Sequence, residues 1–221
     1  MNKDKKAQNE RFLHEAQRQL IRKGFSAEKV DDELLRVHRN QVEICLVDGG
    51  GSVRFRPKDA TDTEADSLLR TVTQTVTEVG EYMRILERAP VLQAVGLDEE
   101  YGILADFSDT VLAARIGKKG AEFVTWEWDF DRRGVHTGHY FMEDYTAAKW
   151  DFAVRSGLVD SQRFFSDEQL EAIDQACEYL LMDGAMVTSE DEKALNDVRE
   201  RIWNLRSASV QRERQAMEQT M

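Results

Sequence analysis

The sequence is poor in the residues that build disulfide frameworks, metal centres and rigid loops. Its 221 residues include two cysteines, four histidines and two prolines. Cys45 and Cys177 lie far apart, and neither has a second cysteine or a histidine at ligand spacing. We therefore expect two reduced thiols in the core, a cytoplasmic setting, and no metal ion or other cofactor.

Long apolar runs are absent as well. No stretch approaches the roughly 18 consecutive apolar residues of a membrane span. The Lys-rich start, residues 1–6, leads into no apolar segment, so we expect neither a membrane-spanning helix nor a signal peptide. A hydrophobic fraction of 41% with so few prolines is typical of a globular chain and excludes wholesale disorder.

The common catalytic signatures are also absent. The sequence contains no Gly-x-Ser-x-Gly elbow, no His-Glu-x-x-His helix and no Cys-x-x-Cys pair. The run from Asp48 to Gly51 has the glycine content of a phosphate-binding loop. However, no Lys-Ser or Lys-Thr follows it, and no helix opens directly behind the glycines. We interpret this run as the turn of a β-hairpin.

Acidic side chains outnumber basic ones, 42 to 30, and give a formal charge of −12. Residues 1–40 hold 10 basic and 7 acidic side chains, whereas residues 141–200 hold 5 basic and 15 acidic ones. Residues 201–221 are again mildly basic, with 4 against 2. Because phosphate backbones attract basic stripes, only the two ends suit contact with nucleic acid, residues 1–40 above all. The acidic body favours a basic protein surface as its partner.

Hydrophobic periodicity predicts the elements of the first half of the chain. Residues 7–23 and 26–37 read as two helices that form a helical hairpin. Alternating apolar residues in 42–46 and 53–55, joined by the glycine turn, predict a β-hairpin. Residues 61–88 contain a strand-like Thr-Val run, but their apolar residues recur at spacings of three and four, which favours one long helix.

The second half reads as a sheet followed by helices. Short turn signals separate the strand-like runs, which favours an antiparallel meander. The expected strands are 103–107, 110–116, 122–130 and 135–141, and the expected helices are 143–156, 166–184 and one that starts at 189. Ser166 with Gln169 predicts a capping box at the start of the second of these helices, and Ser189 with Glu192 predicts a similar cap for the third.

The predicted fold class is α+β. It combines a helical N-terminal segment and a β-hairpin with an antiparallel four-stranded meander and C-terminal helices packed on that sheet. We expect a boundary near residues 90–100, so that residues 1–90 form one domain and residues 91–206 a second. A polar tail, residues 207–221, follows.

The predicted hairpin of residues 126–140 gathers histidines and carboxylates, which suit acid–base chemistry or a metal. With a regular four-residue turn, Asp129 lies opposite His136, and four polar residues share one face: Glu127, Asp129, His136 and Tyr140. In the same register Trp126 lies opposite His139, which faces a core of aromatic side chains. The two histidines then point to opposite sides and do not bind one metal together, unless a bulge shifts the register.

One predicted helix carries a row of acids. Asp167, Glu171, Asp174 and Glu178 follow at helical spacing and line one face, and we call them the acidic ladder. Such a ladder imitates a nucleic-acid backbone. The alternative is an ordinary solvated helix face. A separate apolar stripe is expected to be buried: Leu170, Ile173, Cys177, Leu180 and Leu181.

From about Ala89 to Gly184, short motifs carry a family resemblance. These motifs are Glu87 to Pro90, Ala105 to Ala113, Phe123 to Trp126, Phe130 to Val135, Gly138 to Tyr140, Asp151 to Leu158 and Phe165 to Gln169. The sequence resembles a family of uncharacterised accessory proteins of conjugative and related mobile elements from gut anaerobic bacteria. Asp151 and Arg155, within one motif, are candidates for a specific contact or for an ion pair one helical turn apart.

The resemblance implies a mobile-element setting, in which small acidic proteins often act against host defence. The first hypothesis is a non-enzymatic binding protein that inhibits a host defence nuclease, of the CRISPR or restriction type, through its nucleic-acid-binding surface. The alternative is an accessory factor for DNA transfer or maintenance that contacts DNA through its basic ends. A second alternative is a hydrolase that uses the 127–140 hairpin. The sequence predicts no particular oligomeric state.

Overall fold

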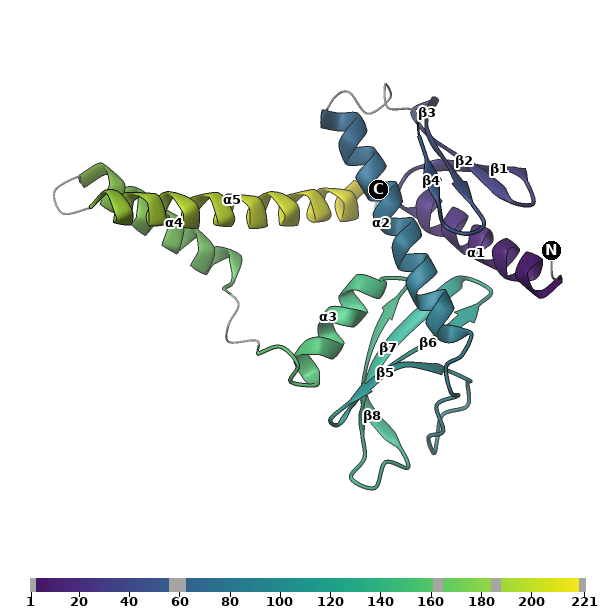
Figure 1. The fold of residues 1–221 in the computed structure, drawn as a ribbon. Helices are drawn as coiled ribbons and strands as arrows, with labels where there is room; N and C mark the ends of the chain where they lie inside the picture. The colour runs from purple at the N-terminus through teal and green to yellow at the C-terminus, as the bar shows by residue number, and fades with distance from the viewer. Residues whose placement is uncertain (1–2, 56–62, 161–164, 184–187, 219–221) are drawn as a thin grey trace. The chain divides into compact units, whose positions relative to one another are not determined.

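The computed structural model describes residues 3–55, 63–160, 165–183 and 188–218 (Figure 1). These residues form five α-helices and two four-stranded antiparallel sheets, which is the expected α+β class. The chain divides into two compact units, Met1–Val159 and Asp160–Met221. None of the described helices is both long and apolar enough to cross a membrane.

The first unit opens with one helix and a four-stranded sheet of order β1-β2-β3-β4, followed by a long helix. The bounds of these elements are α1 (Lys3–Arg22), β1 (Ser26–Asp31), β2 (Leu34–Arg39), β3 (Val42–Asp48), β4 (Val53–Arg54) and α2 (Thr63–Leu86). The predicted β-hairpin of residues 42–55 and the predicted long helix are therefore confirmed.

The predicted second helix, residues 26–37, is wrong, and with it the N-terminal helical hairpin. These residues form β1 and β2, which pair antiparallel around a turn where the backbone N–H of Glu33 donates to Asp31 Oδ1 at 2.8 Å. The apolar residues obey a period of two, since Leu35 and Val37 are fully buried while Val30 is exposed. Spacings of four and three between apolar residues also occur here, and these suggested a helix.

α2 is helical although it contains a run of β-branched residues. Its valines at 72, 76 and 79 recur at helical spacing and are buried. The threonines of the run, residues 71, 73, 75 and 77, each donate a hydroxyl hydrogen bond to the carbonyl four residues earlier. These bonds satisfy the hydroxyls within the helix, so strand-like composition is compatible with helical backbone.

The second sheet is the predicted antiparallel meander, in the order β5-β6-β7-β8. Its strands and the helix that follows are β5 (Gly102–Phe107), β6 (Thr110–Gly117), β7 (Gly120–Trp128), β8 (Val135–Met142) and α3 (Tyr145–Arg155). α3 starts where Asp144 accepts the N–H of Ala147 and ends before Gly157, which has a φ of 75°. It contacts β6, β7 and β8, as predicted for a helix packed on the sheet. The other two predicted helices, expected in the same domain, belong to the second unit.

One hydrophobic core joins the parts that the sequence assigned to separate domains. Tyr82 of α2 packs its ring edge against Phe123 of β7 at 5.0 Å and against Tyr145 of α3 at 5.3 Å, measured between ring centroids. The expected boundary near residues 90–100 therefore lies inside the first unit. The segment around Leu92 and Tyr101 covers the opposite face of the sheet and forms a second, smaller core there.

The second unit contains α4 (Asp167–Asp183) and α5 (Ser189–Glu218), which pack on each other. The predicted capping box is confirmed, because Ser166 N–H donates to the side chain of Gln169 and Gln169 N–H donates back to Ser166 Oγ. α5 is capped one residue earlier than expected, by Thr188 with Asp191. Its helical backbone continues to Glu218, through most of the predicted tail.

A buried carboxylate ties the helices to the second sheet. Glu15 of α1 is 2% exposed, and its Oε1 accepts hydrogen bonds from the hydroxyl of Tyr82, the amide of Gln19 and the backbone N–H of Ala121. Burial and the neighbouring Glu15 raise the pKa of the Tyr82 hydroxyl, which therefore stays a donor. The other carboxylate oxygen of Glu15, Oε2, has no hydrogen-bond partner among the described residues.

Removing the Tyr82 donor tests this connection. Tyr82→Phe should lower the free energy of unfolding by about 1–3 kcal/mol, because a buried carboxylate loses one of its donors. Urea denaturation measures the change. Tyr179→Phe is the control, since Tyr179 is largely exposed and its replacement should leave the stability unchanged. Equal stability of the two variants would contradict the role given to Tyr82.

Candidate functional site

The candidate residues fall in two places, one in each unit. Glu127 and His136 lie on β7 and β8, beside Asp151 and Arg155 of α3. The acidic ladder lies on α4 of the second unit.

A β-bulge in β8 sets the geometry of the first cluster. His136 lies opposite Glu127, and His139 lies opposite Thr125. Three residues of β8 thus span the length of two residues of β7, and the extra residue turns His139 onto the face that carries His136. Both histidines contact carboxylates there. The regular register, in which they point to opposite sides, is therefore wrong, and the structure has the bulge that the sequence analysis left open as the alternative.

The hairpin also departs from the predicted pairing at two other residues, because six residues, 129–134, connect the strands where four were expected, and because of the bulge. Asp129 was expected opposite His136 but lies beyond the end of β7, with its Oδ1 3.8 Å from His136 Nε2. Tyr140 was expected to share the polar face. It lies instead opposite Val124 and packs edge-on against Trp126, at 5.9 Å between ring centroids. Tyr140 is therefore not part of the polar cluster.

Gly138 is the residue that lets the bulge form. A Cβ at this position would lie 2.5 Å from Nε1 of Trp126, closer than any real contact. Trp126 is buried in the smaller core, where it packs against Tyr101 at 5.0 Å between ring centroids, so it cannot move aside. Thr137, the neighbouring bulge residue, has a φ of 49°, which is rare for a β-branched residue. The close packing of Trp126 thus holds the bulge in place.

Arg155 is the centre of the polar cluster, and its side chain is only 10% exposed. Its guanidinium donates to Thr125 Oγ1 at 3.0 Å and to the carbonyl of Thr137 at 2.8 Å. Glu127 Oε1 lies 3.1 Å from Nη2, and Asp151 Oδ2 lies 3.7 Å from Nη1. One side chain of α3 therefore bonds two strands of the sheet, and the predicted Asp151–Arg155 ion pair is present within a larger network.

The network extends to the two histidines. Asp151 accepts a hydrogen bond from Thr125 and lies 2.9 Å from Nδ1 of His139. His136 Nδ1 lies 3.7 Å from Glu127 Oε2. The hydrogen bond from Arg155 holds the pKa of Glu127 below its ordinary value, against the opposing effect of burial. Every carboxylate of the cluster thus has a cationic or hydrogen-bonding neighbour.

Sequence reasoning missed three members of the cluster. Thr125 and Thr137 contribute a hydroxyl and a carbonyl to Arg155, and His139 was placed on the wrong face. The sequence contains little that would predict these three positions, because the bulge depends on the packing of Gly138 against Trp126 and not on a local sequence motif. In the part of the chain that the structure describes, no three His, Cys, Asp or Glu side chains are placed to hold a metal ion.

Two members of the acidic ladder lie close to an arginine of α5. Arg199 of α5 pairs with Asp174 at 2.9 Å and approaches Glu178 at 3.7 Å. Asp174 is half-buried and links the two helices. Asp167, Glu171 and Glu178 are exposed. Three of the four predicted carboxylates therefore face solvent.

The glycine turn acts as predicted, as the turn of a hairpin. Gly50 and Ser52 donate their backbone N–H groups to Asp48 Oδ1 at 3.0 Å, and Gly51 donates to the carbonyl of Asp48 at 2.9 Å. Gly49 donates to the carbonyl of Glu33 at 2.9 Å. Because these four donors already have partners, none of them remains to bind a phosphate.

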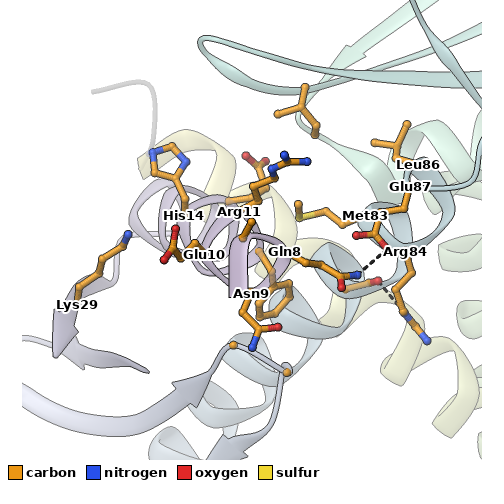
Figure 2. Close-up of a pocket in the computed structure, with 17 residues that line it drawn as sticks. Gln8, Asn9, Glu10, Arg11, His14, Lys29, Met83, Arg84, Leu86 and Glu87 are labelled. Carbon is orange, nitrogen blue, oxygen red and sulfur yellow. Dashed lines mark hydrogen bonds between the residues drawn. The ribbon is translucent and has the colours of Figure 1, made fainter. Parts of the chain in front are cut away.

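A cavity of about 700 Å³ lies beside α1 in the first unit (Figure 2). Residues of α1, of the C-terminal half of α2 and of the glycine turn line it. Two of its polar side chains pair with each other, since Gln8 donates to Glu87 at 2.6 Å. Arg84 donates to the carbonyl of Gly80 at 2.8 Å. None of the predicted site residues lines this cavity.

Adding a methyl group at the bulge tests its dependence on glycine. Gly138→Ala should lower the free energy of unfolding by about 1–3 kcal/mol, because the Cβ overlaps Trp126. Thermal and urea denaturation measure the loss. Gly117→Ala is the control, since a Cβ there meets only ordinary contacts. Equal effects of the two substitutions would contradict the role of Trp126 in holding the bulge.

The pH dependence of stability tests the Glu127–Arg155 pair. Because the pKa of Glu127 is lowered by folding, its stabilising effect is present above the ordinary pKa of 4.5 and is lost as the pH falls through the folded value. The stability difference between wild type and Glu127→Gln should therefore shrink on acidification. In an Arg155→Met background, the free energy of unfolding should itself be lower by about 3–5 kcal/mol. The stability difference caused by Glu127→Gln should then be small at every pH. A pH-independent difference in the wild-type background would contradict this account.

In comparisons with known proteins, the chain matches no protein-family model, no curated protein and no solved structure.

Proposed function

We propose that this protein is a non-enzymatic binding protein that occupies the basic nucleic-acid-binding surface of a host defence nuclease of the CRISPR or restriction type. The observation that carries the proposal is the composition of α4, which holds six carboxylates and no lysine or arginine. A helix that is acidic throughout attracts a basic groove and repels nucleic acid itself.

The acidic ladder supplies the charges for this contact. Asp167, Glu171 and Glu178 are exposed, at spacings of four and seven residues along one side of α4. Asp174 is half-buried between the two helices, and its ion pair with Arg199 joins α5 to α4. We assign it a structural role in the proposed interface.

An exposed tryptophan adds an apolar anchor to the same side of the α4–α5 pair. Arg199 reaches the ladder, and Trp203 follows one turn later on the flank of α5 from which Arg199 extends. Trp203 is 69% exposed. Tryptophan is among the residues that contribute most to binding energy at protein interfaces, and acids around it supply the polar rim.

The basic residues near the N-terminus support the alternative, a DNA-contacting accessory factor, less well. Four of them form ion pairs within the first unit: Lys6 with Asp32, Arg22 with Glu143, Lys23 with Glu78 and Arg36 with Glu43. Paired charges release few counterions on binding DNA, so they contribute little affinity.

The polar cluster around Arg155 supports the hydrolase alternative less well than a structural role. Its arginine is bonded to a threonine hydroxyl, a main-chain carbonyl and a carboxylate. A catalytic arginine needs donors that are free to meet developing charge on a substrate. We therefore place the binding function on the second unit.

Charge reversal tests the proposed interface. The triple variant Asp167→Lys, Glu171→Lys, Glu178→Lys should inhibit a purified CRISPR or restriction nuclease about 100-fold less well than wild type, because like charges then face the basic groove. Nuclease assays over a range of inhibitor concentrations measure the change. Asp174 is left intact so that its ion pair with Arg199, the shorter of the two contacts of this arginine with α4, is retained. Circular dichroism checks that the variant keeps its helices.

A matched control carries the same change of charge elsewhere. Glu28, Asp98 and Glu100 are exposed residues of the first unit, and their replacement by lysine should leave inhibition at the wild-type level. Equal inhibition by both triple variants and by wild type would show that the ladder is not the binding surface. Absence of inhibition by the wild-type protein across both classes of nuclease would refute the proposed function.

A further inference from the structure

The cavity beside α1 has the size and the lining of a small-molecule site. Its volume of about 700 Å³ falls within the range of roughly 300–1,000 Å³ that ligand pockets occupy. Four apolar side chains from α1, α2 and β6 line it: Phe12, Met83, Leu86 and Ile116. Phe12 is buried and Met83 and Leu86 are half-buried, whereas Ile116 is 49% exposed. An apolar molecule in the cavity would therefore remove apolar surface from water.

The acidic residues that line the cavity are already engaged within the protein. Glu10 lies 3.9 Å from Lys6 Nζ, and Glu87 accepts the hydrogen bond of Gln8. Glu15 accepts three hydrogen bonds through Oε1, and its Oε2 is buried from solvent. Because these carboxylates are either partnered or out of reach, they do not favour a cationic ligand.

The basic residues of the lining, in contrast, lack acidic partners. Within the ranges that the structure describes, the side chains of Arg11, His14 and Lys29 form no ion pair and no hydrogen bond. Arg84 donates to the carbonyl of Gly80 and forms no ion pair with a described residue. Acidic side chains outnumber basic ones in this chain, 42 to 30. Basic groups without acidic neighbours at one cavity therefore favour a ligand that carries negative charge.

Arg11 is placed to bind the charged group of such a ligand. Figure 2 shows its side chain extending from α1 toward the side of the cavity where Met83 and Leu86 of α2 lie. A guanidinium holds a carboxylate through two parallel hydrogen bonds, because the two planar groups match in geometry. An apolar body attached to that carboxylate would lie against the aliphatic side chains.

The glycine turn argues against a phosphate ester as the ligand. Gly49 and Gly50 line the cavity, but their backbone N–H groups already donate to acceptors within the protein. A phosphate group at this end of the cavity would find none of the main-chain donors that phosphate-binding loops supply. The lining therefore suits a carboxylate at Arg11 better.

We propose that this cavity binds an aliphatic carboxylate, with the carboxylate on Arg11 and the hydrocarbon chain along Met83, Leu86 and Ile116. Every residue that lines the cavity belongs to the first unit. The site is therefore independent of the nuclease binding proposed for the second unit, and each can fail without the other.

Titration calorimetry of the full-length chain with sodium octanoate tests the proposal. The wild type should bind one octanoate at least about tenfold more tightly than 1-octanol, which has the same chain length and no charge. Arg11→Met keeps an extended apolar side chain but removes the guanidinium. This variant should bind octanoate at least about tenfold more weakly than wild type and 1-octanol equally well. Circular dichroism checks that it keeps its helices.

Arg70→Met is the matched control. Arg70 is exposed on α2, about 20 Å before Met83 by helical rise, and does not line the cavity. This variant should bind octanoate with the wild-type affinity. Three results would each overturn the proposal: no saturable binding of octanoate by the wild type, equal wild-type affinities for octanoate and 1-octanol, or unchanged octanoate binding by a folded Arg11→Met variant.

Discussion

The ion pairs of Arg199 with Asp174 and Glu178 determine what the second unit can present to a partner. By joining α5 to the edge of the acidic ladder, they bring the exposed Trp203 to the side of the helix pair that carries the ladder. The proposed binding function depends on this arrangement, since a basic groove suits a side of the helix pair on which acids and an exposed aromatic residue lie together. On an isolated helix, the same row of acids would have no neighbouring helix to fix which side chains lie beside it.

In the first unit, the corresponding constraint is the bulge in β8 beside Trp126. It sets both histidines toward α3, where Arg155 joins two strands through a hydroxyl, a carbonyl and a carboxylate. In the sequence, the residues of this cluster suggest acid–base chemistry. In the structure, their charged groups form ion pairs and hydrogen bonds that connect α3 to the sheet. Glu15 does the same for α1, through Tyr82 and Ala121.

Sequence patterns predicted the elements whose apolar period extends over many residues, and failed where tertiary contacts decide. α2 and the meander follow from spacing alone, and the capping box at Ser166 follows from local hydrogen bonding. Residues 26–37 are short enough to fit two periods, and pairing with β3 selects the strands. Within the candidate site, helical spacing alone predicted the acidic ladder. The contact of Asp174 with α5 and the bulge at Gly138 could not be predicted in this way, because they depend on side chains distant in sequence.

The salt dependence of inhibition tests the central claim, that an acidic surface of this protein occupies a basic nucleic-acid-binding groove. The measurement is the inhibition constant of the wild-type protein against a CRISPR or restriction nuclease, determined from low to high ionic strength. Inhibition that weakens steeply with added salt is the predicted result, because the ladder lies at the surface where ions screen it. Inhibition that is independent of salt would contradict the account.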